Sequence, residues 1–129
     1  MKKMISALII ICALFINQNV KAQTMEKNVT IIELRQTDGQ FETQNLELTA
    51  GKYQFRVVNK DVDKDLGLAI QKKEDEGKDF MKTALPTAFT SQLVKKGKAE
   101  YSGIVELKKG KYIYFCPLNP TPHYKLTVK

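Results

Sequence analysis

The chain is dominated by short runs of β-branched and aromatic residues, separated by turns rich in Gly, Lys and Asp, from residue 28 to the C-terminus. Such runs are typical of β-strands joined by turns, and we expect antiparallel pairing between them. The expected strands span residues 28–35, 41–48, 52–59, 66–71, 87–94, 99–106, 111–116 and 124–128. About eight strands in one small domain predict an all-β Greek-key sandwich or barrel.

One stretch departs from this pattern. Residues 72–85 are charged at first and then carry Phe80, Met81 and Leu85 at helix-like spacing, directly before Pro86. Apolar residues three to four positions apart favour a helical turn over a strand. We therefore expect one short helix or loop insertion near residues 72–86.

The N-terminus has the layout of an export signal. Lys2 and Lys3 precede an apolar run over residues 5–16, and the segment ends at Ala22. A basic start, a short apolar run and a small residue at the end are typical of a secretory signal peptide, and the run is too short to span a bilayer. The sequence predicts a leader over residues 1–22 and one domain over residues 23–129, with a periplasmic or secreted location.

The leader also accounts for part of the basic character. It carries three of the 21 basic residues and none of the 14 acidic ones, so its removal lowers the formal net charge from +7 to +4. The remaining charge lies in lysine-rich turns, which form either a solvated surface or a docking patch for an acidic partner. A nucleic-acid partner is not expected, because no element combines a basic stripe with aromatic residues.

Cysteine content points to one position. Cys12 falls within the predicted leader, so the exported chain keeps only Cys116 and cannot close an internal disulfide. A lone thiol in an exported protein is a metal ligand, a reactive group, one half of an intermolecular disulfide, or a buried small apolar residue. We expect a monomer, with an intermolecular disulfide through Cys116 as the alternative.

The C-terminal segment carries a recognisable pattern. It reads Gly110-Lys111-Tyr112-Ile113-Tyr114-Phe115-Cys116-Pro117, followed by a loop to His123 and a final strand. This pattern resembles the copper-binding end of the cupredoxins, the blue copper proteins, and weaker similarity extends over residues 29–128. The resemblance implies a cupredoxin-like sandwich and, in a complete family member, copper-dependent electron transfer.

The resemblance is incomplete at the ligands. A blue copper centre combines two imidazoles with a thiolate, often with a weak axial methionine. The resemblance places the first imidazole at Lys64 or Asp65 and the second near Asn119, while His123, the sole histidine, follows Cys116 by seven residues. Electron transfer at an ordinary blue copper centre is therefore not expected.

Three interpretations of Cys116 remain open from the sequence. In the first, Cys116 and His123 hold copper or another soft metal ion, with Asn119, Asp63 or Asp65 as the candidates for a further ligand. The second is a metal-free interaction or structural module of the cell envelope, whose partner is an envelope protein or a redox protein.

The third interpretation is thiol chemistry, in which His123 lowers the pKa of Cys116. The sequence contains no hydrolase, phosphate-binding or dinucleotide-binding motif. We therefore expect a protein that is not an enzyme.

Overall fold

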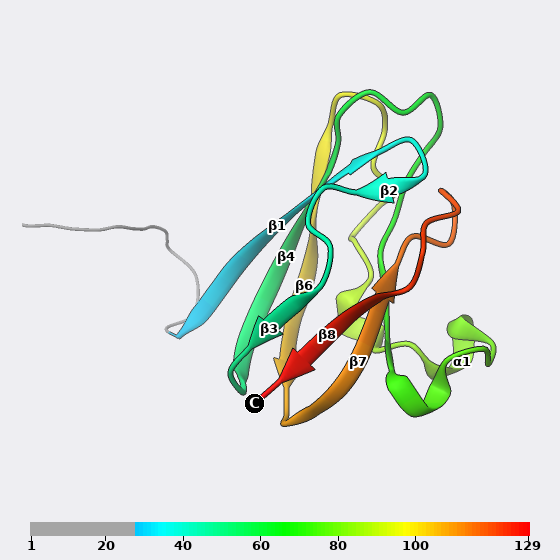
Figure 1. Cartoon of the computed structure of the whole chain (residues 1–129). Helices are drawn as coiled ribbons and strands as arrows, with labels where there is room; N and C mark the ends of the chain where they lie inside the picture. The colour runs from blue at the N-terminus through cyan, green and yellow to red at the C-terminus, as the bar shows by residue number, and fades with distance from the viewer. Residues whose placement is uncertain (1–27) are drawn as a thin grey trace, which may run out of the picture.

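The computed structural model describes residues 28–129, and the predicted signal peptide over residues 1–22 lies outside this range. The described strands form two four-stranded sheets that face each other (Figure 1). This arrangement confirms the predicted all-β sandwich. Among the described residues, no helix has the length and apolar character needed to cross a membrane.

The two sheets draw on strands from distant parts of the sequence. The first sheet contains, in spatial order, β2 (Gln40–Phe41), β1 (Val29–Thr37), β4 (Gly51–Asn59) and β6 (Ala99–Leu107). The second contains β3 (Leu46–Leu48), β8 (Tyr124–Val128), β7 (Gly110–Phe115) and β5 (Ala69–Lys72).

The expected antiparallel pairing is found in four of the six strand pairs and is wrong for the other two. β1 pairs with β4 in parallel over eight residue pairs, and β3 pairs with β8 in parallel over three. Each parallel pair joins strands that are separated by a passage of the chain through the other sheet. After such a passage a strand can return in the same direction as its neighbour, which a hairpin cannot do.

Two predicted strands also needed correction. The predicted strand 41–48 is two short strands, because the chain crosses from the first sheet to the second between β2 and β3, where Asn45 has φ 76°. The predicted strand 87–94 forms no ladder. It begins in the 3₁₀ turn η2 (Pro86–Ala88), because proline lacks a backbone N–H, and then makes two isolated bridges, Thr90 to Ser102 and Leu66 to Val94.

The insertion after β5 is confirmed. It contains the 3₁₀ turn η1 (Lys73–Asp75) and the single helical turn α1 (Phe80–Thr83), which begins where the Asp79 carboxylate accepts a hydrogen bond from the Met81 N–H at 3.0 Å. This segment lies against the outer face of β5 and β7 (Figure 1). It covers the apolar side chains that this sheet presents away from the sandwich core.

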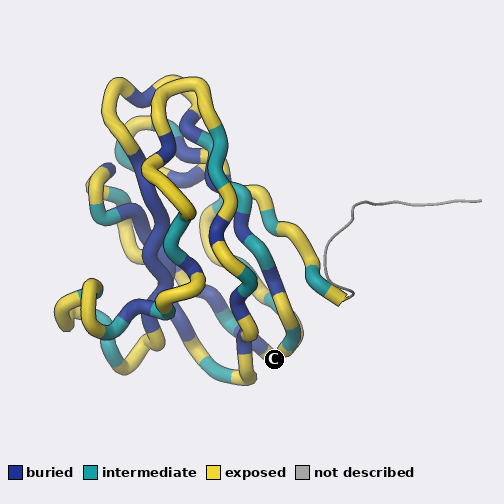
Figure 2. Tube along the Cα trace, turned by 180° about the vertical axis from the view of Figure 1, so that it is seen from behind, coloured by how far each residue is buried: buried dark blue, intermediate teal, exposed yellow. Residues whose placement is uncertain are grey.

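Side chains on β7 alternate between two apolar clusters, as the period-two geometry of a strand requires. Tyr112, Tyr114 and Cys116 point into the core between the sheets. Ile113 and Phe115 point to the other side, where Phe80 and Phe89 pack against them. Buried residues alternate with half-buried and exposed ones along the strands, and exposed residues gather in the end loops (Figure 2). Cys116 follows β7 directly and so lies at one end of the core.

Candidate functional site

Cys116 follows the last residue of β7, and its side chain is only 2% exposed. Its Sγ atom accepts hydrogen bonds from the backbone N–H groups of Gly67 at 3.4 Å and Asn119 at 3.3 Å. Its own N–H donates to Thr121 Oγ1 at 3.1 Å. The thiol is thus held by two separate chain segments, although sulfur is only a weak acceptor.

Asn119 is fully buried beside the thiol. Its side-chain amide donates to Gln36 Oε1 at 3.1 Å and to the Thr37 carbonyl at 3.0 Å. Its amide oxygen accepts from the Gly39 N–H at 2.8 Å. The side chain therefore fastens the loop after β7 to the β1–β2 hairpin instead of pointing at a site next to the sulfur.

Gln36 completes a closed set of hydrogen bonds. It is fully buried and donates through Nε2 to the Gly67 carbonyl at 2.8 Å. Gly67 in turn donates to the sulfur, and so does Asn119. We call Gln36, Gly67, Cys116 and Asn119 the amide ring. It links a strand of the first sheet to the loop that follows β7 in the second.

Sequence reasoning missed Gln36, although a signal was available. Along β1 the alternation that buries Leu34 also buries Gln36, so a polar residue occupies a core-facing position. A buried side-chain amide nearly always has partners within the protein. The sequence does not reveal which partners, since Asn119 lies 83 residues away.

His123 lies on the opposite side of β7 from the thiol. Its ring stacks on Phe115, with ring centroids 4.5 Å apart and an interplanar angle of 29°. Its Nδ1 atom is 2.8 Å from Glu76 Oε2. Phe115 and Cys116 point to different clusters. The structure therefore does not bring His123 to the sulfur, either as a fellow metal ligand or as a base.

The contacts of His123 join the loop to the insertion. The hydrogen bond from Lys73 holds the pKa of the Glu76 carboxyl below its usual value, and the hydrogen bond with His123 contributes a smaller part of the same effect. Lys73 also forms an ion pair with Glu76. The imidazole is thus part of an exposed charged cluster on the insertion.

The acidic candidates are also directed elsewhere. Asp63 is exposed and pairs with Lys96 at 2.7 Å, which lowers the pKa of the Asp63 carboxyl. Lys64 and Asp65 are exposed, and the backbone that contacts the sulfur belongs to Gly67. Over residues 28–129, no three His, Cys, Asp or Glu side chains converge on a point where they could hold a metal ion.

The positions of these side chains show whether the predicted ligands could hold a copper ion. The predicted set of Cys116, His123, Asn119 and Asp65 is not assembled, because the imidazole contacts Glu76 and the Asn119 amide contacts the β1–β2 hairpin. A blue copper centre needs two imidazoles and a thiolate around one ion. The described residues do not fit that group.

An apolar pocket of about 360 Å³ opens next to the thiol. Gly67, whose N–H contacts the sulfur, and Pro117, which follows Cys116 in the sequence, both line this pocket. Three further lining residues are large apolar side chains that remain exposed: Met81 at 69%, Leu93 at 50% and Leu118 at 45%. No charged side chain lines this pocket. The pocket therefore keeps apolar surface open to solvent beside the loop that carries Cys116.

Comparison with known proteins gives the family. The family model of the cupredoxin-like domain matches residues 6–128. The chain belongs to the cupredoxin-like domain family. A comparison of its sequence with curated proteins gives no match.

Solved cupredoxins share the fold. Auracyanin B has a TM-score of 0.62 at 18% identity, over 82% of this chain and 93% of its own. Auracyanin A, a blue copper protein of the green thermophilic photosynthetic bacterium Chloroflexus aurantiacus, has a TM-score of 0.60 at 16% identity, over 78% and 99%. Amicyanin from Paracoccus versutus has a TM-score of 0.50 at 19% identity, over 81% and 85%. The cupredoxin-like fold predicted from the sequence is confirmed.

Proposed function

We propose that this cupredoxin-like protein is an exported recognition module that works without a metal at Cys116. In this proposal the protein docks an apolar side chain of a cell-envelope protein in the pocket beside the thiol. The observation that carries the proposal is the amide ring, which uses the sulfur and the Asn119 side chain in hydrogen bonds within the protein.

The cost of breaking buried hydrogen bonds supports the proposal that no metal binds at Cys116. Turning Asn119 toward a bound ion would break its bonds to Thr37 and Gly39 and leave the Gln36 oxygen without its donor. Leaving a buried polar group unpaired costs about 1–3 kcal/mol for each group. The other residue that donates to the sulfur is Gly67, which has no side chain to offer as a metal ligand.

The pocket supports the recognition part of the proposal. Apolar hollows of this size, with few polar groups, are the usual form of binding sites. The surface elsewhere is rich in charge, so a partner with one protruding apolar side chain would select this end of the sandwich.

Copper titration tests the metal-free part. The chain without its predicted leader is titrated anaerobically with Cu(I) against a competing chelator, beside Cys116→Ser and His123→Ala, and a visible spectrum is recorded with Cu(II). We expect binding no tighter than in the two variants and no intense blue band. Tight one-to-one binding that both variants lose would contradict the proposal.

Dye binding tests the pocket. We expect the neutral dye Nile red to gain fluorescence with the wild-type protein and to lose that gain in Leu118→Asp. Tyr101→Asp is the matched control, because Tyr101 is 43% exposed but lies on β6, outside the pocket. Equal fluorescence from all three proteins would show that the pocket does not take an apolar guest.

A further inference from the structure

A second hollow lies on the outer face of the sheet β3-β8-β7-β5, next to the insertion. Its volume is about 330 Å³. The residues that line it come from η1, β7 and β8 and are Lys73, Lys111, Tyr112, Lys125 and Thr127. Three of the five are lysines, and we call this site the lysine hollow.

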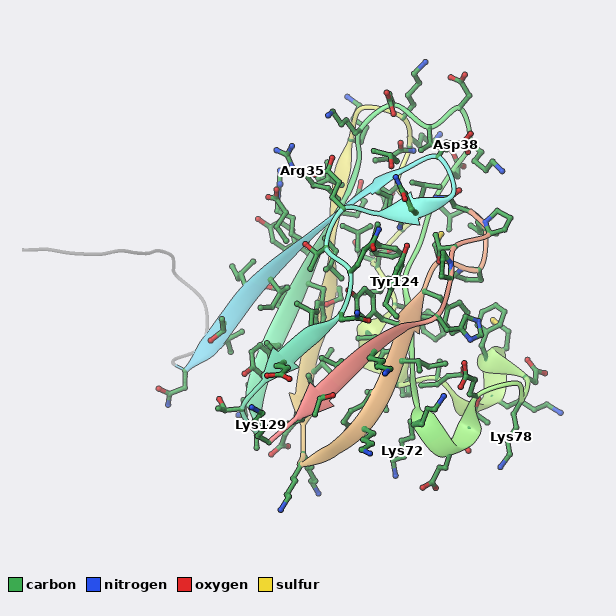
Figure 3. The ribbon with its side chains drawn as sticks, viewed as in Figure 1. Arg35, Asp38, Lys72, Lys78, Tyr124 and Lys129 are labelled. Carbon is green, nitrogen blue, oxygen red and sulfur yellow. The ribbon has the colours of Figure 1, made fainter. Side chains whose placement is uncertain are left out.

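Strand pairing explains why the lysines converge. Lys111 lies directly opposite Thr127, and Lys125 lies opposite Ile113, which belongs to the outer cluster. The side chains of Lys111, Lys125 and Thr127 therefore share the outer face, whereas that of Tyr112 points into the core. Lys72 lies opposite Tyr112 in the last pair between β5 and β7, so Lys73, the first residue of η1, reaches the same place. Figure 3 shows that side chains crowd this lower part of β7, near the labelled Lys72.

Charge in the lysine hollow is only partly compensated. Lys73 pairs with Glu76. Among residues 28–129 the Lys111 and Lys125 ammonium groups have no ion pair or hydrogen bond, and the Thr127 hydroxyl has no hydrogen bond. Like charges on neighbouring positions of adjacent strands repel. The hollow thus presents two uncompensated positive charges and one free hydroxyl.

We propose that the lysine hollow binds the phosphate group of a small phosphate monoester. A phosphate dianion matches the two free ammonium groups, and the Thr127 hydroxyl supplies a further donor. A carboxylate carries a single charge and would leave one ammonium group uncompensated. The volume leaves room for the organic part of the ester beside the phosphate.

A lipid phosphate has the same chemistry, but the surroundings favour a soluble ester. The exposed large apolar side chains of the described residues are Ile31, Met81, Leu93, Tyr101 and Leu118, and none of them lines the lysine hollow. A membrane-bound surface usually adds apolar side chains that enter the lipid to its basic ones. The experiment separates the two sources.

Chemical-shift titration of the ¹⁵N-labelled protein with glycerol 3-phosphate at low ionic strength tests this site. We expect saturable shifts in β7 and β8, and affinity about tenfold lower in the double variant Lys111→Gln, Lys125→Gln, since charge-assisted hydrogen bonds contribute on this order. The matched control is Lys64→Gln, Lys95→Gln, which removes two exposed lysines elsewhere. The control should bind as the wild type does.

Thr127→Val should weaken binding several-fold without changing the net charge. Shifts that do not saturate, or an equal loss in both double variants, would overturn the proposal in favour of general charge attraction. Flotation with phosphatidylcholine vesicles, with and without phosphatidic acid, identifies the source. Retention on the acidic vesicles alongside saturable ester binding supports a headgroup at this site, and ester binding without retention supports a soluble ligand.

Discussion

The side-chain amides of Gln36 and Asn119 are buried, so each of their hydrogen bonds has to be made within the protein. Asn119 uses both of its donors and its oxygen, on partners at least 80 residues away. The sequence marks Cys116 and Asn119 as unusual because they lie in a recognisable loop. It cannot show where their partners lie, because those contacts depend on how the two sheets are placed against each other.

Replacing Asn119 tests this network. We expect Asn119→Ala to lower the free energy of unfolding by about 2–4 kcal/mol, since it leaves the buried Gln36 side-chain oxygen without its donor and the partly buried Gly39 N–H without its acceptor. Urea denaturation measures the change. Gln92→Ala, at an exposed amide, is the control and should cost less than about 0.5 kcal/mol. A cost for Asn119→Ala as small as that of the control would contradict the role of the ring.

Tyr114 provides a pH-dependent test of core burial. Burial raises the pKa of the Tyr114 phenol to about 12, while its hydroxyl donates to the Thr43 carbonyl at 2.7 Å. In the unfolded chain the phenol ionises near its ordinary pKa of about 10, so its stabilising contribution is complete below that pH and is lost as the pH rises toward 12.

We therefore expect the wild type to lose stability above pH 10 more steeply than Tyr114→Phe does. Denaturation curves at a series of alkaline pH values measure both slopes, and the lysine residues common to both proteins cancel in the difference. Parallel pH profiles would show that the phenol ionises as easily in the fold as in the unfolded chain.

At the scale of elements, local patterns predicted the strands better than their pairing. The strand at 124–128 and the alternation along β7 follow from period-two patterning, and the helical turn at Phe80 follows from its spacing. The predicted strand 41–48 failed because the apolar alternation changes phase between Phe41 and Leu46, where the chain passes from one sheet to the other. Which sheet a strand joins depends on non-local contacts, and a pattern of apolar residues does not encode it.

The insertion offers an element-level prediction. Phe80 packs edge-on against Phe115 with ring centroids 6.1 Å apart. We expect Phe80→Ala to cost about 1–3 kcal/mol and to speed amide hydrogen exchange in residues 73–88, with the sandwich strands still protected. Met81→Ala is a matched control on the same turn, because Met81 is 69% exposed. Unchanged exchange in Phe80→Ala would mean that other contacts hold the insertion in place.

At the scale of the whole molecule, the two sheets are joined by apolar packing and by hydrogen bonds, among them the amide ring at the thiol end and the bond from the Phe41 N–H to the Tyr124 hydroxyl. The free thiol is part of this interior. Its burial bears on the expectation of an intermolecular disulfide, since a sulfur that is 2% exposed has to leave the core before it can meet another chain.

We expect Cys116 in the folded protein to resist alkylation by iodoacetamide and to react rapidly in urea. The native protein should also run as a monomer on a non-reducing gel after mild oxidation. Mass spectrometry of the alkylated chain gives the rate in each state. Fast alkylation without denaturant would show that the end loops open often enough to expose the sulfur.

The amide ring has a consequence for how such a protein becomes ready for use after export. A metal cofactor has to be delivered to the protein, retained and protected from competing metals. Until it arrives, the residues of its site lack the contacts that would hold them in place. Backbone and side-chain amides travel with the polypeptide. On the metal-free proposal, maturation ends when the chain folds, and a cell starved of copper would still hold its full complement of working molecules.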